Sequence, residues 1–221
     1  MVGWPGHVMA MGKIKSARPG SDEGQRRILL AARTAFATHG FEGASLRAIS
    51  ASAGVLHTAM LYHFPSKDAL WRAVMADMFE AVEARFAAVA VQFAGEPPSH
   101  LARALVREFV AFCAACPELH RIMTFEGCSD SERLSWLVDN YSRRLFDSVT
   151  LMASVASPLI ADPIRLYYAV IGLSASAFTL APEYRRLSGR DPFAADEVAA
   201  TANLVEQLVF GRELNAPPNR V

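Results

Sequence analysis

The chain has 221 residues, of which 52% are hydrophobic, so it can bury a sizeable core in one large domain or in a small and a medium one. Its three cysteines, Cys113, Cys116 and Cys128, are too few for a disulfide framework, and basic and acidic residues balance at 22 each. The start lacks the order of a signal peptide, and the longest weakly polar runs are too short to cross a bilayer. We therefore expect a soluble, cytoplasmic protein with no membrane partner.

The first predicted helix follows a leader that has no periodicity. Residues 1–20 contain Gly, Pro and scattered basic residues, a composition typical of a disordered arm. The next residues predict a helix over 22–39, with Ser21 as its N-cap and Gly40 as the residue that ends it. Apolar residues at helical spacing mark its buried face: Ile28, Ala32, Ala35 and Phe36.

Two short helices are expected next, over 46–52 and 56–63. Ser45 is a natural N-cap for the first, and Gly54 allows a tight turn between them because glycine readily takes a positive φ. Pro65 prevents the second helix from continuing. Two short helices around a glycine-containing turn form a helix-turn-helix.

A long helix is expected over 67–93, with Ser66 as its N-cap. It would be roughly 40 Å long, enough to link a head to a distant body. Apolar residues line one of its faces: Leu70, Val74, Met78, Val82, Phe86, Val89 and Phe93. The Gly-Glu-Pro-Pro sequence at 95–98 then breaks the pattern.

The remaining helices are expected near residues 99–116, 118–126, 130–156, 163–181 and 193–211, with a frayed tail over 215–221. Asp162 and Asp191 each precede a proline, which is the usual order of cap and first residue at the start of a helix. The sequence therefore predicts an all-α protein.

The basic residues are concentrated near the N-terminus. Residues 13–67 carry eight Lys and Arg against three Asp and Glu, a net charge of about +5 that leaves about −5 on the rest of the chain. A basic N-terminal quarter on an acidic body indicates a face built to bind phosphate, as in a protein that binds nucleic acid.

Residues 43–70 combine several features in one fixed register. The features are the capping Ser45, the aliphatic Ile49, the Ala-Gly-Val turn at 53–55, the aromatic-His-Phe end at 62–64 and the Ser-Lys start of the long helix at 66–67. This segment resembles the DNA-binding domain of the TetR family of bacterial regulators, and the resemblance extends over about residues 22–82. It implies an N-terminal three-helix helix-turn-helix DNA-binding domain over 21–66 and a helical ligand-binding and dimerisation domain over 67–214.

The resemblance also implies which residues contact double-stranded DNA. They are Ser45, Arg47, His57, Thr58, Tyr62, His63 and Lys67. The second short helix would lie in the major groove, and the helix N-termini would favour phosphate. Two alternatives stay open: His63 packs in a semi-buried hinge, and Arg47 is a solvated surface charge.

The chain departs from the family's pattern at two positions. Many members carry Ser or Thr where Leu56 stands, and Leu56 cannot cap the second short helix, which loosens that end by about 1 kcal/mol. Many members carry Tyr where Leu61 stands, whereas the tyrosine here is Tyr62, about 100° further round the helix.

The body is rich in aromatic and sulfur-containing residues. Such stripes are usually core, but the resemblance implies that some line a cavity for an unknown, largely apolar small-molecule effector. The candidates are Phe109, Phe112, Met123, Phe125, Trp136, Tyr141 and Tyr167. For a homodimer interface between the last two helices, the small or apolar candidates are Gly172, Ser176, Ala202, Val205 and Val209.

No catalytic motif is present, so we expect neither an enzyme nor a bound cofactor or metal. The sequence predicts a repressor that a small apolar ligand releases from a palindromic operator. One alternative is the same DNA-binding head gated by oxidation or by a metal at Cys113 and Cys116, although apolar flanks favour buried structural thiols there. The other is an all-helical enzyme or carrier that does not bind DNA.

Overall fold

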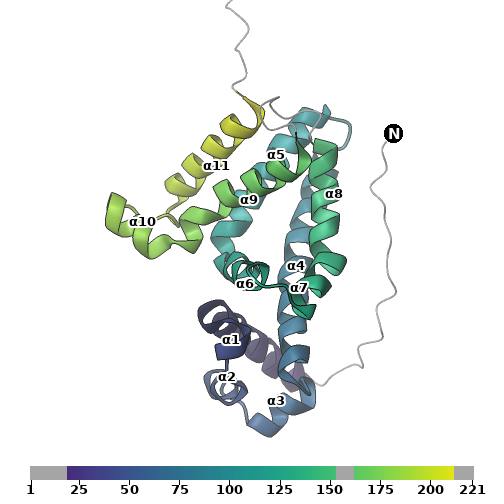
Figure 1. The fold of residues 1–221 in the computed structure, drawn as a ribbon, viewed down its shortest axis with the longest axis vertical. Helices are drawn as coiled ribbons and strands as arrows, with labels where there is room; N and C mark the ends of the chain where they lie inside the picture. The colour runs from purple at the N-terminus through teal and green to yellow at the C-terminus, as the bar shows by residue number, and fades with distance from the viewer. Residues whose placement is uncertain (1–18, 153–161, 212–221) are drawn as a thin grey trace, which may run out of the picture.

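The computed structural model describes residues 19–152 and 162–211, and every regular element in that part of the chain is helical, as predicted (Figure 1). In chain order these are α1 (Pro19–Gly43), α2 (Leu46–Ser52), α3 (His57–His63), α4 (Lys67–Gln92), α5 (Pro98–Ala115), α6 (Pro117–Gly127), α7 (Glu132–Leu137), the π-helical turn η1 (Val138–Ser142), α8 (Arg143–Met152), α9 (Pro163–Thr179), α10 (Ala181–Ser188) and α11 (Ala195–Phe210). The predicted arm up to residue 18, the end of the helix predicted over 130–156 and the tail over 215–221 lie outside the described residues.

Helices α1 to α3, with the first turns of α4, form the part that we call the head; the remaining helices form the body. Two predicted serine caps are confirmed. The Ser45 hydroxyl accepts a hydrogen bond from the Ala48 amide at 3.5 Å, and the Ser66 hydroxyl accepts one from the Ala69 amide at 3.0 Å. These caps begin α2 and α4 at the predicted residues because each one satisfies an amide that has no partner within the helix.

The first helix ends at Gly40 as predicted, since this glycine has a φ of 66° and a ψ of 178° and so leaves the helical conformation. A further short turn follows and carries Phe41, Glu42 and Gly43. The predicted cap at Ser21 is wrong, because α1 begins at Pro19 and Ser21 lies within its first turn.

Apolar side chains from all four helices pack together inside the head. Those exposed by 1% or less are Ile28, Ala32, Phe36, Ile49, Met60, Leu70 and Trp71. Burying a large apolar side chain contributes about 1.5–3 kcal/mol. This packing therefore sets how α2 and α3 lie against α1 and the start of α4.

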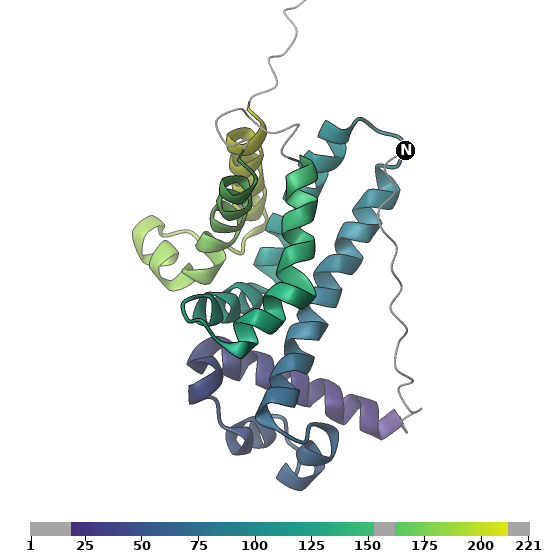
Figure 2. The ribbon, with the colours of Figure 1, turned by 45° about the vertical axis from the view of Figure 1, so that its right-hand side comes forward.

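Helix α4 continues from the head along one side of the body (Figure 2). Its predicted apolar face is buried as far as Val82, while Phe86, Val89 and Phe93 are only partly buried. Trp71, Met75 and Phe79 are buried as well, so α4 is covered on a wider face than the sequence predicts.

The body has a second core, in which α9 and α11 both pack against α5. Its buried members include Val106 and Val110 of α5, Phe178 of α9 and Val205 of α11. No single described helix is long and apolar enough to span a membrane, although α9 and α10 pass that test of length and composition when they are taken together across their 73° bend.

Three predicted elements of the body differ from the structure. The helix expected over 130–156 is divided into α7, η1 and α8. The Asp162 carboxylate caps α9 as predicted, accepting from the Arg165 amide at 3.1 Å, but Asp191 caps no helix, because α11 begins at Ala195. Between α9 and α11 the chain forms α10, which was not predicted.

Helix α6 packs against α1 and so joins the body to the head (Figure 1). The Nε of Arg33 in α1 lies 3.8 Å from the Oε1 of Glu118 in α6, and both side chains are largely buried. The ring of Phe125 lies 3.6 Å from where a Cβ on Gly40 would stand. The head therefore contacts the body beyond its covalent link through α4.

Candidate functional site

Helix α3 has a buried face and a solvent-facing one. Met60 is fully buried in the head core, and Phe64 just after the helix is 5% exposed. Thr58, Ala59 and Tyr62 are exposed on the other face, Tyr62 to 86%. Because Thr58 and Tyr62 are one turn apart, their hydroxyls lie on the same face and are available to a molecule that approaches α3.

The start of α2 lies beside this face, since α2 and α3 pack together around the Gly54 turn. Ser45 and Arg47 are both exposed there. The free amides at the N-terminus of α2 and the Arg47 guanidinium both favour an anion such as phosphate.

The three other predicted DNA contacts are only partly exposed. The Nδ1 of His57 is buried and has no hydrogen-bond partner among the described residues. The His63 ring has its centroid 5.5 Å from that of Tyr62 and 6.4 Å from that of Phe64, which fits the alternative of a packed hinge residue. Lys67 donates from Nζ to the Glu42 carbonyl oxygen at 3.0 Å, which uses one of its three N–H donors.

Sequence reasoning missed Leu56 and Ala59 on this surface. Leu56 is 77% exposed just before α3, where its extended backbone has the usual conformation of an N-cap residue but its side chain caps nothing. Ala59 follows Thr58 on the exposed face. The helical register of Thr58 and Tyr62 was the signal that could have identified Ala59.

An apolar cavity of about 80 Å³ lies among the described helices of the body. Helices α4, α5, α8, α9 and α11 line it, with Phe86, Leu105, Val106, Phe109, Leu145, Ser148, Val149, Leu166, Tyr167, Val170, Ile171, Val209 and Phe210. A larger hollow of about 510 Å³ lies between α1 and α2, but it is an open groove on the head. We take the smaller, more enclosed cavity as the candidate effector site, because enclosure removes an apolar ligand from water.

Of the seven residues predicted to line a pocket, only Phe109 and Tyr167 line this cavity. Trp136 and Tyr141 instead pack on α4, with Trp136 against Trp71 and Tyr141 stacked on Phe79 at 4.3 Å between ring centroids. Phe112 is buried in the main core, Met123 packs against that core, and Phe125 is half exposed.

Tyr167 carries the one hydroxyl group among the aromatic residues of the cavity. Burial raises the pKa of Tyr167, and a hydrogen bond with Ser142 partly offsets that effect. The phenol is therefore neutral near pH 7 and is held against η1. Its ring belongs to a cavity wall, and its hydroxyl connects that wall to the π-helical turn.

The burial of Cys113 and Cys116 agrees with the structural thiols that the sequence favours. Cys113 and Cys116 are buried free thiols, and burial raises the pKa of Cys113 to about 12. Burial also raises the pKa of Cys116 and lowers the pKa of His120, so both thiols and the imidazole favour their neutral forms. Within the described ranges no three His, Cys, Asp or Glu side chains are placed to hold a metal ion.

Comparison with known proteins identifies the family. The family model described as bacterial regulatory proteins, tetR family, matches residues 28–74. The transcriptional regulator RutR of Escherichia coli strain K12 is 27% identical over 169 residues, which are 75% of this chain and 78% of that protein. The head is that of a TetR-family regulator. The chain is accordingly a DNA-binding transcription regulator and not an enzyme.

Solved structures share the TetR-family fold over most of their length. A TetR-like transcriptional regulator from Rhodococcus sp. RHA1 aligns with a TM-score of 0.59 at 19% identity, covering 88% of this chain and 96% of that one. AibR, in a complex with isovaleryl coenzyme A and operator DNA, aligns with a TM-score of 0.67 at 17% identity, covering 85% of this chain and 98% of its own.

The body also exposes large apolar side chains on its last two long helices, α9 and α11. The dimer stripe predicted on α11 does not form it, because Ala202, Val205 and Val209 are buried within their own chain. Of the two candidates on α9, Gly172 is partly buried and Ser176 is exposed. The large exposed apolar residues are Ile164, Tyr168, Leu173 and Leu180 of α9 and just after it, and Leu204 and Leu208 of α11. We call these six residues the outer face.

Proposed function

We propose that this chain is a ligand-responsive repressor. Two heads of a homodimer bind a palindromic operator, and a small apolar molecule in the body cavity releases them. The observation that carries the proposal is the exposed face of α3, where Thr58, Ala59 and Tyr62 project from a helix anchored by Met60. An exposed α-helix of this kind fits the major groove of B-DNA.

The proposed contacts divide into two kinds. Thr58 and Tyr62 face the bases, together with the apolar Ala59, which suits a thymine methyl. Ser45, Arg47 and Lys67 contact phosphates at the starts of α2 and α4. His57 and His63, being partly buried, support the position of α3 and offer only an edge of each ring to DNA.

The proposed domain division follows the helices. The DNA-binding domain corresponds to residues 21–66, with α1 to α3, and the ligand-binding and dimerisation domain corresponds to 67–214, with α4 to α11. The outer face supports dimerisation, because exposed apolar side chains on two adjacent helices gain stability when a second copy covers them. Two-fold symmetry of such a dimer would make the operator palindromic.

The effector proposal rests on the chemistry of the cavity. The lining is apolar apart from the hydroxyls of Ser148 and Tyr167, so it suits a hydrocarbon or aromatic group. A volume of about 80 Å³ admits only a small group without movement of the walls. The solved structure of AibR is a complex with isovaleryl coenzyme A and operator DNA, which supports a fold able to bind an effector and DNA.

Selection of bound sequences from random duplex DNA tests the function directly. We expect enrichment of a palindrome whose half-sites are about one helical turn apart, or a small multiple of that distance. Tyr62→Ala should reduce recovery, whereas the control Leu187→Ala, which removes an exposed side chain from α10, should not. A screen of small apolar molecules for operator release would then identify the effector. Absence of any enriched sequence would contradict the proposal.

A further inference from the structure

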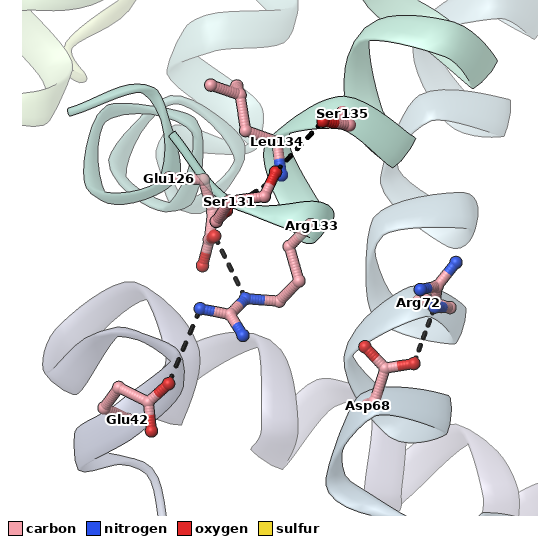
Figure 3. Close-up of polar contacts among 8 residues, drawn as sticks. All are labelled: Glu42, Asp68, Arg72, Glu126, Ser131, Arg133, Leu134 and Ser135. Atoms are coloured by element: carbon pink, nitrogen blue, oxygen red, sulfur yellow. Dashed lines mark hydrogen bonds and ion pairs between the residues drawn. The ribbon is translucent and has the colours of Figure 1, made fainter. Parts of the chain in front are cut away.

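Arg133 connects the body to the head through two carboxylates (Figure 3). Its Nε donates to the Oε2 of Glu126 in α6 at 3.0 Å. Its Nη2 lies 3.6 Å from the Oε1 of Glu42 in the head. The Glu126 carboxylate is only 5% exposed, so it needs a charged partner, whereas Glu42 is 85% exposed. Arg133 is thus anchored in the body and reaches out to the head.

The same guanidinium covers an aromatic ring of the head. Its central carbon lies 3.8 Å from the centroid of Phe41, a close cation–π contact. Phe41 in turn stacks on Phe36 and meets Trp71 edge-on, and both of these side chains are fully buried in the head core. A body residue therefore contacts the head core through a single ring.

A proposed phosphate-binding residue shares this contact. The Nζ of Lys67 lies 4.7 Å from the centroid of Phe41 and donates to the Glu42 carbonyl oxygen. The short turn that carries Phe41 and Glu42 is therefore held by Arg133 of the body and by Lys67 of the head. A change at Arg133 alters the surroundings of Lys67 directly.

The helical run that carries Arg133 leads to the cavity. It continues from α7 through η1 into α8, whose Leu145, Ser148 and Val149 form one wall of the cavity. Ser142, in η1, is hydrogen-bonded to the hydroxyl of Tyr167, a residue of α9 that also lines the cavity. A π-helical turn in a helix is often found at functional sites, since it can shift the register between the segments on either side.

Among the cavity walls, α8 offers the least resistance to movement. The cavity holds about 80 Å³, whereas ligand pockets usually measure roughly 300–1,000 Å³, so an effector must displace a wall. Helices α5, α9 and α11 each contribute fully buried residues to the body core. The described side chains of α8 are all partly or fully exposed, so moving α8 breaks less packing.

From these contacts we propose that Arg133 is a positioning residue that transmits the state of the cavity to the DNA-binding head. An effector bound in the cavity displaces α8, the displacement passes through η1 to α7, and Arg133 moves away from Phe41 and Glu42. The head then loses the contact that orients it for operator binding. This inference rests on the proposed function and names the element that regulates it.

Because the effector is not identified, the test uses a bulky side chain in the cavity to stand in for it. Val149→Phe adds bulk to the α8 wall, and Val149→Leu is a milder version if the first unfolds the protein. Arg133→Ala removes the contact with the head, with Arg133→Met as the alternative that keeps the length of the side chain. Arg85→Ala is the matched control, because Arg85 pairs with Glu108 at 3.0 Å and lies over Phe112, and both of these partners belong to α5.

Operator affinity is measured for each single and double variant, on the duplex found by selection. We expect Val149→Phe to weaken binding by about 5- to 150-fold, the range of ordinary allosteric coupling. In the Arg133→Ala background the same substitution should change affinity less than about twofold, and in the Arg85→Ala background it should keep its full effect. An equal effect of Val149→Phe with and without Arg133 would overturn the proposal, and so would no effect in the wild-type background.

Hydrogen exchange at the amides of residues 40–45 tests the role of Arg133 without DNA, so its outcome is independent of the proposed function. We expect faster exchange there in Arg133→Ala and in Val149→Phe, with no further acceleration in the double variant, and no change in Arg85→Ala. If no duplex is bound, the proposed function fails, but this measurement still decides whether the cavity and the head communicate through Arg133. If the two substitutions accelerated exchange additively in the double variant, communication through Arg133 would be contradicted.

Discussion

Lys67 and Thr58 lie close to the same surface but in different electrostatic settings. Lys67 is a positive charge at the start of α4, while Thr58 is a neutral side chain on the exposed face of α3. We expect Lys67→Ala to weaken binding to all duplexes alike and to lower the salt slope of the binding constant by about one. Thr58→Ala should instead relax preference at one base pair, by up to about 1–3 kcal/mol. Titrations of several duplexes over a salt series would show this, and a reversed pattern would mean that the two roles were exchanged.

Cys113 should be inert in the folded protein. Its pKa is raised to about 12 by burial, so at pH 8 roughly one thiol in ten thousand is ionised, and the thiolate is the reactive form. We expect iodoacetamide to modify the exposed Cys128 within minutes and Cys113 only when the chain unfolds, as read by mass spectrometry. Denatured protein is the control. Rapid modification of Cys113 in the native state would restore the thiol-sensing alternative.

Helix α3 lacks a side-chain cap, and this can be corrected without loss of core packing. Leu56 has extended backbone geometry and is 77% exposed, so serine fits there and can accept a hydrogen bond from a free amide of α3. We expect Leu56→Ser to stabilise the protein by about 0.5–1 kcal/mol relative to Leu56→Ala, which removes the same apolar side chain but cannot cap. Urea unfolding measures the stability of the two variants. Equal midpoints would show that a serine at position 56 does not stabilise α3 as a cap.

Two glycines of α1 should respond in opposite directions to alanine. Gly40 has a φ of 66° and a ψ of 178°, a region essentially restricted to glycine that costs an L-residue about 1–3 kcal/mol, and a new Cβ would stand 3.6 Å from the Phe125 ring. Gly24 is inside the helix with nothing within 4 Å of the added atom, so alanine should stabilise it by about 0.5–1 kcal/mol. Thermal unfolding would measure both changes. If Gly40→Ala were as stable as the wild type, the turn that follows Gly40 would be able to rearrange.

Operator binding by two heads should depend on the outer face. Leu204 on α11 is 54% exposed, and an arginine there would carry an unpaired charge into the proposed interface. We expect Leu204→Arg to be monomeric in sedimentation at micromolar concentration and to bind the operator at least tenfold more weakly, because a single head contacts one half-site. The control Val91→Arg places the same charge on an exposed position near the end of α4 and should remain dimeric. A dimeric Leu204→Arg chain would place the interface elsewhere.

Local signals in the sequence determined most of the helix boundaries and the shape of the head. Ser45, Ser66 and Asp162 each bond an amide three residues away, and Gly40 and Gly54 act through their own φ. Such effects need no distant partner, so they can be recognised in order along the chain. The same reasoning failed at Asp191, whose carboxylate bonds Arg185 instead of a helix terminus.

Only the tertiary structure decided which partner each apolar face meets. The sequence assigns Ala202, Val205 and Val209 to a dimer interface, but they are buried within their own chain, and the exposed leucines of α11 lie on its other face. Trp136 and Tyr141 likewise pack on α4 and leave the cavity to Leu145, Val149 and Tyr167. The physical reason is that apolar burial is favourable against any apolar surface, so periodicity predicts that a face is buried without specifying what covers it.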